Sequence, residues 1–85
     1  MRVIICGAGQ VGYSIASYLA REENDVTVID ENREIIGRIN DELDVNGLVG
    51  HASNPETLNT AGAGEADMII AVTHSDEVNM VACQV

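Results

Sequence analysis

The stretch VIICGAGQVG, residues 3–12, decides the fold of this chain. Its first half is a β-branched run closed by a cysteine, which predicts a fully buried strand over Arg2–Cys6. Its second half, Gly7-Ala8-Gly9-Gln10-Val11-Gly12, has the spacing G-x-G-x-x-G and leads into a helical pattern. A buried strand, a glycine-rich turn and a helix in this order are typical of the start of a parallel α/β sheet.

The rest of the chain continues the alternation of strands and helices. We expect a helix from Gln10 to about Glu22, a strand over Val26–Asp30, a helix from Asn32 to about Leu43, a strand over Gly47–Val49, a helix from Pro55 to near Ala61, a strand over Met68–Val72, and a last helix from Ser75 or Asp76 onward. This order predicts right-handed crossovers and a Rossmann-like, doubly wound parallel sheet with strand order 3-2-1-4. We expect residues 1–85 to form one domain that lacks its C-terminal part, because the chain stops inside the last predicted helix.

Two helices show a recognisable apolar face. In the first helix the face consists of Val11, Ile15, Tyr18 and Leu19. In the second helix Asn32 is the predicted N-cap, and the face consists of Ile35, Ile36, Ile39 and Leu43. These faces are expected to pack on the sheet. In the third helix Asn54 is the predicted cap, followed by Pro55 at the first helical position.

The composition narrows the class of partner. The chain has 14 acidic residues, four arginines and no lysine, which gives a net charge of −10. Nucleic acids and anionic membranes bind basic patches, so both are disfavoured as partners. No apolar run approaches the length of a membrane span, and no signal peptide is recognisable. We therefore expect a cytoplasmic location, with Cys6 and Cys83 as buried thiols and no metal site.

The glycine motif predicts a dinucleotide site. Gly7 permits a tight turn after the strand, Gly9 lets the backbone approach a pyrophosphate, and Gly12 lets the helix pack closely on the sheet. The free amides at the helix N-terminus bind the anion. Asp30 ends the next strand, where its carboxylate can accept hydrogen bonds from the two hydroxyls of an adenosine ribose.

The carboxylates also indicate which dinucleotide fits. Asp30 and its neighbour Glu31 would repel a 2′-phosphate, which favours NAD⁺ or NADH over the phosphorylated cofactor. Arg33 would offset part of this repulsion. ATP, ADP and S-adenosylmethionine remain alternatives, because each carries the same ribose diol.

Two further segments are expected at the same edge of the sheet, beyond the carboxyl ends of the strands. Gly50-His51-Ala52-Ser53 follows the third strand, and we assign His51 and Ala52 to the adenine side of the site. Thr73 and His74 follow the fourth strand and are assigned to the centre of the dinucleotide. No residue here has the setting of a catalytic nucleophile or base, so we expect no enzymatic activity.

Several segments together resemble one family. The chain is similar to the N-terminal domain of the Trk-type potassium-uptake NAD-binding subunit, an RCK/KTN-type Rossmann domain. The likeness rests on residues 3–12, on Val28-Ile29-Asp30-Glu31-Asn32, on Gly50-His51-Ala52-Ser53-Asn54-Pro55, and on residues 66–73 and 76–80. It spans essentially the whole chain.

The resemblance implies a regulatory role. Proteins of this kind are cytosolic subunits, peripheral to the inner face of the membrane, that assemble beneath a potassium-translocating protein. They bind NAD⁺ or NADH, or in relatives ATP or ADP, and change shape to gate transport without turning the nucleotide over. The family's domain continues through two more strands, so we expect this chain to self-associate through its fourth strand and last helix.

Three other interpretations stay open at this point. The chain could be the N-terminal part of an NAD-dependent dehydrogenase, whose substrate domain would follow. It could be a module for another adenosine ligand, or a dimerisation fragment with no useful affinity for nucleotides.

Overall fold

The computed structural model describes residues 1–51 and 54–72. Its elements follow one another as β1 (Arg2–Cys6), α1 (Gln10–Arg21), β2 (Asp25–Asp30), α2 (Arg33–Glu42), β3 (Asn46–Val49), α3 (Pro55–Thr60), the short 3₁₀ helix η1 (Ala63–Glu65) and β4 (Met68–Ala71). Each predicted strand and helix within these residues is confirmed, with ends that shift by one residue or two. The last predicted helix and the expected contacts of Cys83 lie outside the described residues.

The four strands form one parallel sheet in the order β3-β2-β1-β4, as predicted. The central strand β1 pairs with β2 on one side and with β4 on the other, so that Ile4 lies between Thr27 and Ile69. The outer strand β3 pairs with β2, with Val49 opposite Asp30. The reversal of strand order at β1 makes a switch point, where the carboxyl ends of the strands leave room for a ligand.

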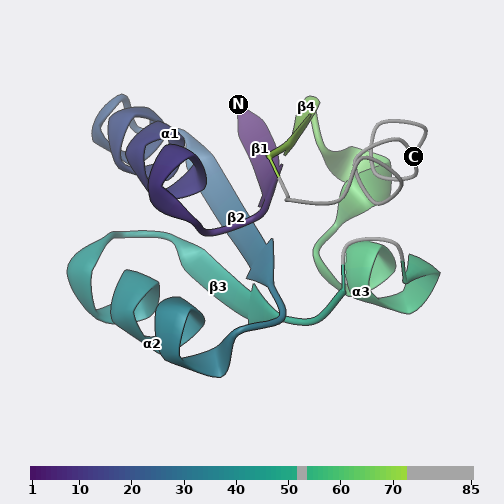
Figure 1. The fold of residues 1–85 in the computed structure, drawn as a ribbon. Helices are drawn as coiled ribbons and strands as arrows, with labels where there is room; N and C mark the ends of the chain where they lie inside the picture. The colour runs from purple at the N-terminus through teal and green to yellow at the C-terminus, as the bar shows by residue number, and fades with distance from the viewer. Residues whose placement is uncertain (52–53, 73–85) are drawn as a thin grey trace.

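Helices cover both faces of the sheet (Figure 1): α1 and α2 lie on one side and α3 on the other. Alternate residues of each strand therefore enter two separate cores. The core under α1 and α2 contains Val3, Ile5, Ala8, Ala16, Val26, Val28, Ile36 and Ile39. The core under α3 contains Ile4, Cys6, Ile29 and Leu58. This two-faced burial explains why the strands are continuous apolar runs.

The predicted inner face of α1 is partly wrong. Val11 and Tyr18 are 62% and 60% exposed, whereas the buried residues of the helix are Gly12 and Ala16. Small residues allow the helix backbone to come close to the sheet, and this close approach turns the larger Val11 and Tyr18 outward. Ile15 and Leu19 flank the contact and are half-buried, as the pattern predicted.

The other two α-helices begin at asparagine caps. The Asn32 side chain accepts hydrogen bonds from the amides of Glu34 and Ile35, and the Asn54 side chain accepts one from the amide of Glu56. Both caps were predicted from the sequence. The 3₁₀ helix η1 was not predicted. Gly62 precedes it and adopts the left-handed region (φ 86°), but in the sequence this glycine indicated only the end of a helix.

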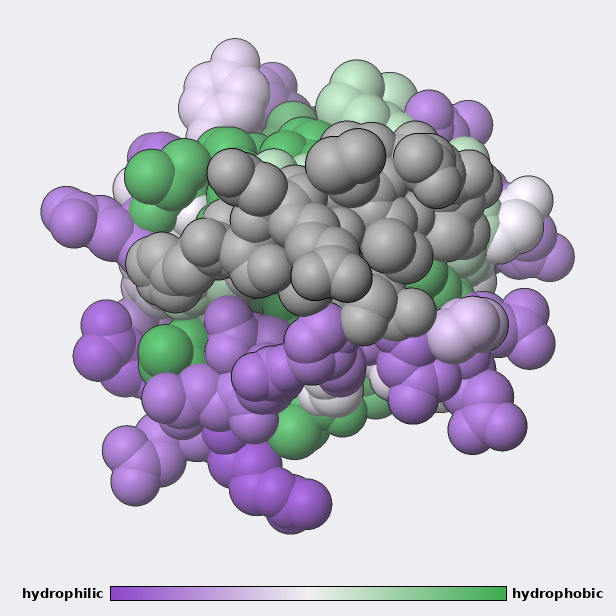
Figure 2. Space-filling view, turned by 45° about the vertical axis from the view of Figure 1, so that its right-hand side comes forward, coloured by the Kyte–Doolittle hydropathy of each residue, from purple (hydrophilic) through white to green (hydrophobic). Residues whose placement is uncertain are grey.

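The surface reflects the acidic composition. Figure 2 shows hydrophilic side chains over most of the lower half of one face of the molecule. Within the described residues, no helix is both long enough and apolar enough to cross a membrane.

Candidate nucleotide site

The glycine loop lies where β1 ends and α1 begins. Gly7 adopts a φ of 114°, which reverses the chain, and its amide donates to the Ile29 carbonyl of β2 at 2.8 Å. Gly9 is the N-cap of α1, and its carbonyl accepts the first helical hydrogen bond from Tyr13 at 2.8 Å. No side chain caps this helix among the described residues, in contrast to α2 and α3. The first amides of α1 are thus oriented as anion donors.

The environments of two loop glycines agree with the roles predicted for them. A Cβ built on Gly12 would lie 1.9 Å from the Gly7 carbonyl oxygen and 3.2 Å from a methyl group of Val72. Gly12 is therefore required for contact between the helix and the loop. A Cβ on Gly9 would have no atom of residues 1–51 or 54–72 within 4 Å. Because the fold itself does not need a glycine at that position, the space beside Gly9 is available for a ligand.

Asp30 connects the end of β2 to the glycine loop. Its Oδ2 accepts a hydrogen bond from the Ala8 amide at 2.8 Å, and its Oδ1 accepts one from the Asn32 amide at 2.8 Å. The side chain is half-buried. A carboxylate has about four acceptor positions, so both oxygens can still accept hydroxyl groups. These two backbone bonds were not foreseen from the sequence, and they fix the carboxylate beside the loop.

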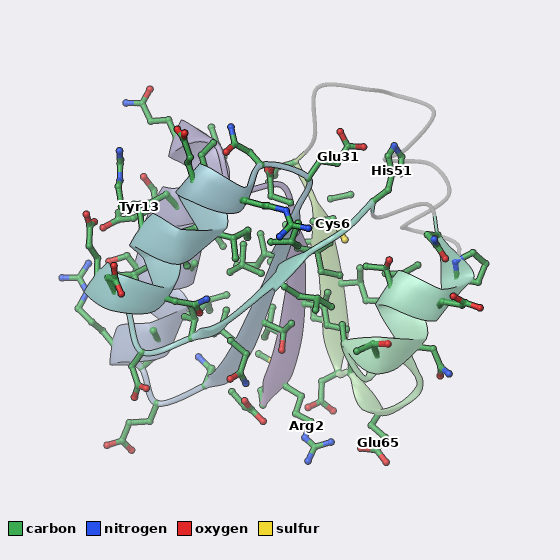
Figure 3. All side chains as sticks on the ribbon, turned by 90° about the horizontal axis from the view of Figure 1, so that it is seen from below. Arg2, Cys6, Tyr13, Glu31, His51 and Glu65 are labelled. Carbon is green, nitrogen blue, oxygen red and sulfur yellow. The ribbon has the colours of Figure 1, made fainter. Side chains whose placement is uncertain are left out.

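His51 lies one residue beyond Gly50, at the end of β3. The Gly50 amide donates to the Asp30 carbonyl at 2.9 Å, which ties the ends of β2 and β3 together. The His51 Nε2 lies 2.9 Å from the Glu31 Oε1. Figure 3 shows the two side chains near each other, at the end of the sheet opposite to Arg2 and Glu65. The sequence assigned both residues to the site without predicting their contact, although they follow neighbouring parallel strands.

The predicted site residues that the structure describes therefore meet at one edge of the sheet. Gln10 and Val11 are exposed in the first turn of α1, next to the glycines. Ala52, Thr73 and His74 lie outside the described residues, and their expected contacts stay predictions. No group of histidine, cysteine or acidic side chains in the described part of the chain could hold a metal ion.

Cys6 ends β1 directly before the glycine loop, but its side chain lies in the core and does not line the site. Its side chain is fully buried in the core beneath α3, with no exposed surface, as predicted for a structural thiol. Apolar burial of this kind keeps a thiol unreactive.

A separate cavity of about 270 Å³ opens at the other end of the sheet. Its lining includes Arg2, Asp25, Thr27 and Asn46. Arg2 forms ion pairs there with Asp25 and with Glu65, so its charge is already balanced. This cavity lies away from the glycine loop and plays no part in the site.

Comparison with known proteins identifies the family. The model of the TrkA-N domain matches residues 3–85. The chain belongs to the TrkA-N domain family. Relatives named Trk system potassium uptake protein TrkA are 59% identical in Azorhizobium caulinodans and 52% identical in Halomonas elongata, each over the whole of this chain. This TrkA-N domain spans about a fifth of their length, 19% in both cases.

Solved structures support the same fold. A Shewanella denitrificans Kef CTD in AMP-bound form is similar over 99% of this TrkA-N domain and 50% of that chain, with a TM-score of 0.82 and 19% identity. The NADPH-dependent reductase YwfH is similar over 96% of the domain and 41% of that chain, with a TM-score of 0.67 and 20% identity. Both similarities establish the Rossmann-like architecture.

Proposed function

We propose that this TrkA-N domain binds NAD⁺ or NADH at the edge formed by the glycine loop and Asp30. In this proposal the pyrophosphate lies on Gly7, Ala8, Gly9, Gln10, Val11 and Gly12, and the adenosine ribose lies against Asp30. Glu31, His51 and Ala52 line the adenosine side, and Thr73 and His74 contact the centre of the ligand.

One observation carries the proposal: the 2.8 Å hydrogen bond from the Ala8 amide to the Asp30 carboxylate. It joins the loop suited to a pyrophosphate with the carboxylate suited to a ribose diol. The distance between these two groups in a dinucleotide is short, so a site for both needs them side by side. The uncapped first turn of α1 adds the positive end of a helix dipole for the phosphates.

We further propose that binding regulates potassium transport and involves no chemistry on the nucleotide. The names of the relatives support a role in potassium uptake. In this role the domain acts within a longer cytoplasmic protein, peripheral to the membrane, which forms homo-oligomers and contacts a potassium-translocating subunit. Binding can shift transport only if the nucleotide has different affinities for two conformations of the assembly.

The test of binding is calorimetric titration with NADH, NAD⁺, ATP and ADP. We expect NADH or NAD⁺ to bind, and Asp30→Asn to weaken binding about tenfold or more, because hydrogen bonds to a charged acceptor are lost. Asn keeps the size of the side chain and one acceptor oxygen, but it can accept from only one of the two backbone amides that Asp30 binds, those of Ala8 and Asn32. Circular dichroism of the variant therefore accompanies the titration, to separate weaker binding from loss of the fold. If ATP or ADP binds more tightly than either dinucleotide, the ligand of the site is an adenosine nucleotide with the same ribose diol, and the proposal of NAD⁺ or NADH is contradicted.

Gly9→Ala offers a sharper test. The new methyl group meets no atom of the described residues within 4 Å, and the φ of −68° suits alanine, so the domain should fold normally. In the bound state the methyl group would occupy the space of the pyrophosphate, and we expect affinity to fall about tenfold or more. Gly37→Ala is the matched control, since it makes the same change in open space on α2. Equal affinities of the two variants would contradict the proposed position of the pyrophosphate.

A further inference from the structure

The pair formed by His51 and Glu31 gives the site a property beyond recognition of the ligand. We propose that protonation of His51, held by Glu31, strengthens nucleotide binding, so that the affinity of the site rises as the pH falls. The inference rests on the proposed function, because it concerns regulation of the same site. It requires that the pair be close to the bound anion and able to change its charge near neutral pH.

The geometry meets the first requirement. Glu31 directly follows Asp30, and His51 follows Gly50, whose amide is bonded to the Asp30 carbonyl at 2.9 Å. The contact between His51 and Glu31 therefore crosses from the end of β2 to the end of β3, beside the carboxylate proposed to bind the ribose. Any nucleotide on Asp30 would lie next to this bridge.

The chemistry of the pair meets the second requirement. A distance of 2.9 Å between Nε2 and Oε1 needs a proton on Nε2, which either the neutral or the charged imidazole can supply. Histidine ordinarily changes its charge between about pH 5 and pH 8. The side chains of His51 and Glu31 are 43% and 67% exposed, so protons exchange freely with solvent.

The local charge decides the direction of the effect. When His51 is neutral, Asp30 and Glu31 present two adjacent carboxylates to an anionic ligand. When His51 is charged, it balances Glu31 and lowers the repulsion. In the first turns of the adjoining helices, the other ionisable side chains are Arg33 and Glu34 on α2 and Glu56 on α3.

NADH is the appropriate probe, because its pyrophosphate diester keeps a constant charge near neutral pH. We expect calorimetry to give an affinity for NADH about three to ten times higher at pH 6 than at pH 8. Binding should also take up protons, since coupling between two sites is reciprocal. The uptake is measured by repeating the titration in buffers with different ionisation enthalpies.

Two variants separate the members of the pair. His51→Gln should bind NADH equally at both pH values, at the weaker level that the unaltered chain shows at pH 8. Glu31→Gln should bind more tightly at pH 8, because one carboxylate is removed. Glu65→Gln loses the same charge at the opposite end of the sheet and should retain the full pH dependence (Figure 3).

The outcomes distinguish this inference from the proposed function. If NADH binds but His51→Gln keeps the pH dependence, another group such as His74 is responsible and the inference is overturned. If NADH binds with equal affinity at both pH values, the inference also fails while the proposed function stands. If NADH does not bind at either pH, the proposed function itself fails, and the inference fails with it.

Discussion

At the scale of single residues, the loop glycines illustrate how one motif combines different requirements. Gly7 is needed for its backbone conformation, since its φ is 114°. Gly12 is needed for packing, because a Cβ there would overlap the Gly7 carbonyl oxygen. In the part of the chain that the structure describes, a Cβ on Gly9 would meet no atom within 4 Å, so in the proposed function the requirement for glycine comes from the ligand. Substitutions at Gly9 and Gly12 should therefore have different consequences.

Gly12→Ala should destabilise the domain strongly. The added methyl group would lie 1.9 Å from a backbone oxygen, and backbone cannot move aside as a flexible side chain can. We expect the free energy of unfolding in urea to fall by about 3 kcal/mol, the upper end of the usual cost of overpacking. Gly9→Ala should cost less than about 1 kcal/mol. Equal losses in both variants would show that the packing of α1 does not depend on Gly12.

Tyr13 has an altered acidity that can be measured directly. Its hydroxyl donates to the Glu42 carboxylate, and this hydrogen bond, followed by partial desolvation and the charge of Glu42, raises the pKa of Tyr13 above its ordinary value of 10.0. Because the folded pKa is raised, the contribution of this bond to stability is present below pH 10 and is lost as the pH rises through the folded pKa.

We expect Glu42→Gln to lower the pKa of Tyr13 toward 10.0. The measurement is an ultraviolet titration of tyrosinate in a Tyr18→Phe background, where Tyr13 is the only remaining tyrosine. Tyr18 is 60% exposed, so its replacement should leave the fold intact. An unchanged titration midpoint in Glu42→Gln would mean that the hydrogen bond between α1 and α2 does not form in solution.

At the scale of elements, α2 shows how local signals and packing act together. Its N-terminus is fixed by Asn32, whose side chain accepts two amide hydrogens, and its buried residues Ile36 and Ile39 hold it on the sheet. Gly37 lies between them in the sequence, and a Cβ built on it would have no atom of the described residues within 4 Å. A glycine at an exposed helical position adds backbone entropy to the unfolded chain without any compensating contact. This position is therefore a weak point of the helix.

Gly37→Ala should stabilise the domain by about 0.5–1 kcal/mol, the difference in helix propensity between the two residues. Gly47→Ala is the contrasting change, because its Cβ would lie 2.8 Å from an Ile36 methyl group and 2.9 Å from the Asn40 amide. It should lower stability. Urea unfolding followed by circular dichroism compares the two, and a loss of stability in Gly37→Ala would contradict the helical assignment at that position.

At the scale of the whole molecule, charge is the distinctive feature. The chain carries fourteen acidic residues and four arginines. The longest extent of the molecule is 28 Å. At low ionic strength the screening length is about 30 Å, so every carboxylate repels every other. Such self-repulsion destabilises a compact state. The edge of the sheet that forms the candidate site also has an excess of negative charge. A positive charge on His51 would therefore reduce the repulsion of an anionic ligand there.

Added salt should therefore stabilise the domain. Raising sodium chloride from about 0.01 M to about 0.15 M shortens the screening length to about 8 Å, well below the size of the molecule. We expect the midpoint of thermal unfolding to rise by a few degrees, as measured by circular dichroism at pH 7. Potassium chloride should give the same rise, which separates screening from specific ion binding. A midpoint that falls with salt would indicate that ion pairs outweigh the repulsion.

The sequence by itself determined the order of the strands and α-helices that the structure describes, the parallel sheet with strand order 3-2-1-4, the caps Asn32 and Asn54, and the position of the glycine loop. These features depend on local periodicity and on turn and cap chemistry, which neighbouring residues specify. Only the tertiary structure decided that Gly12 and Ala16, not Val11 and Tyr18, face the sheet. It alone also brought Ala8 to Asp30 and His51 to Glu31. Helical periodicity defines a stripe of residues, but how closely a helix approaches a sheet depends on contacts between distant segments.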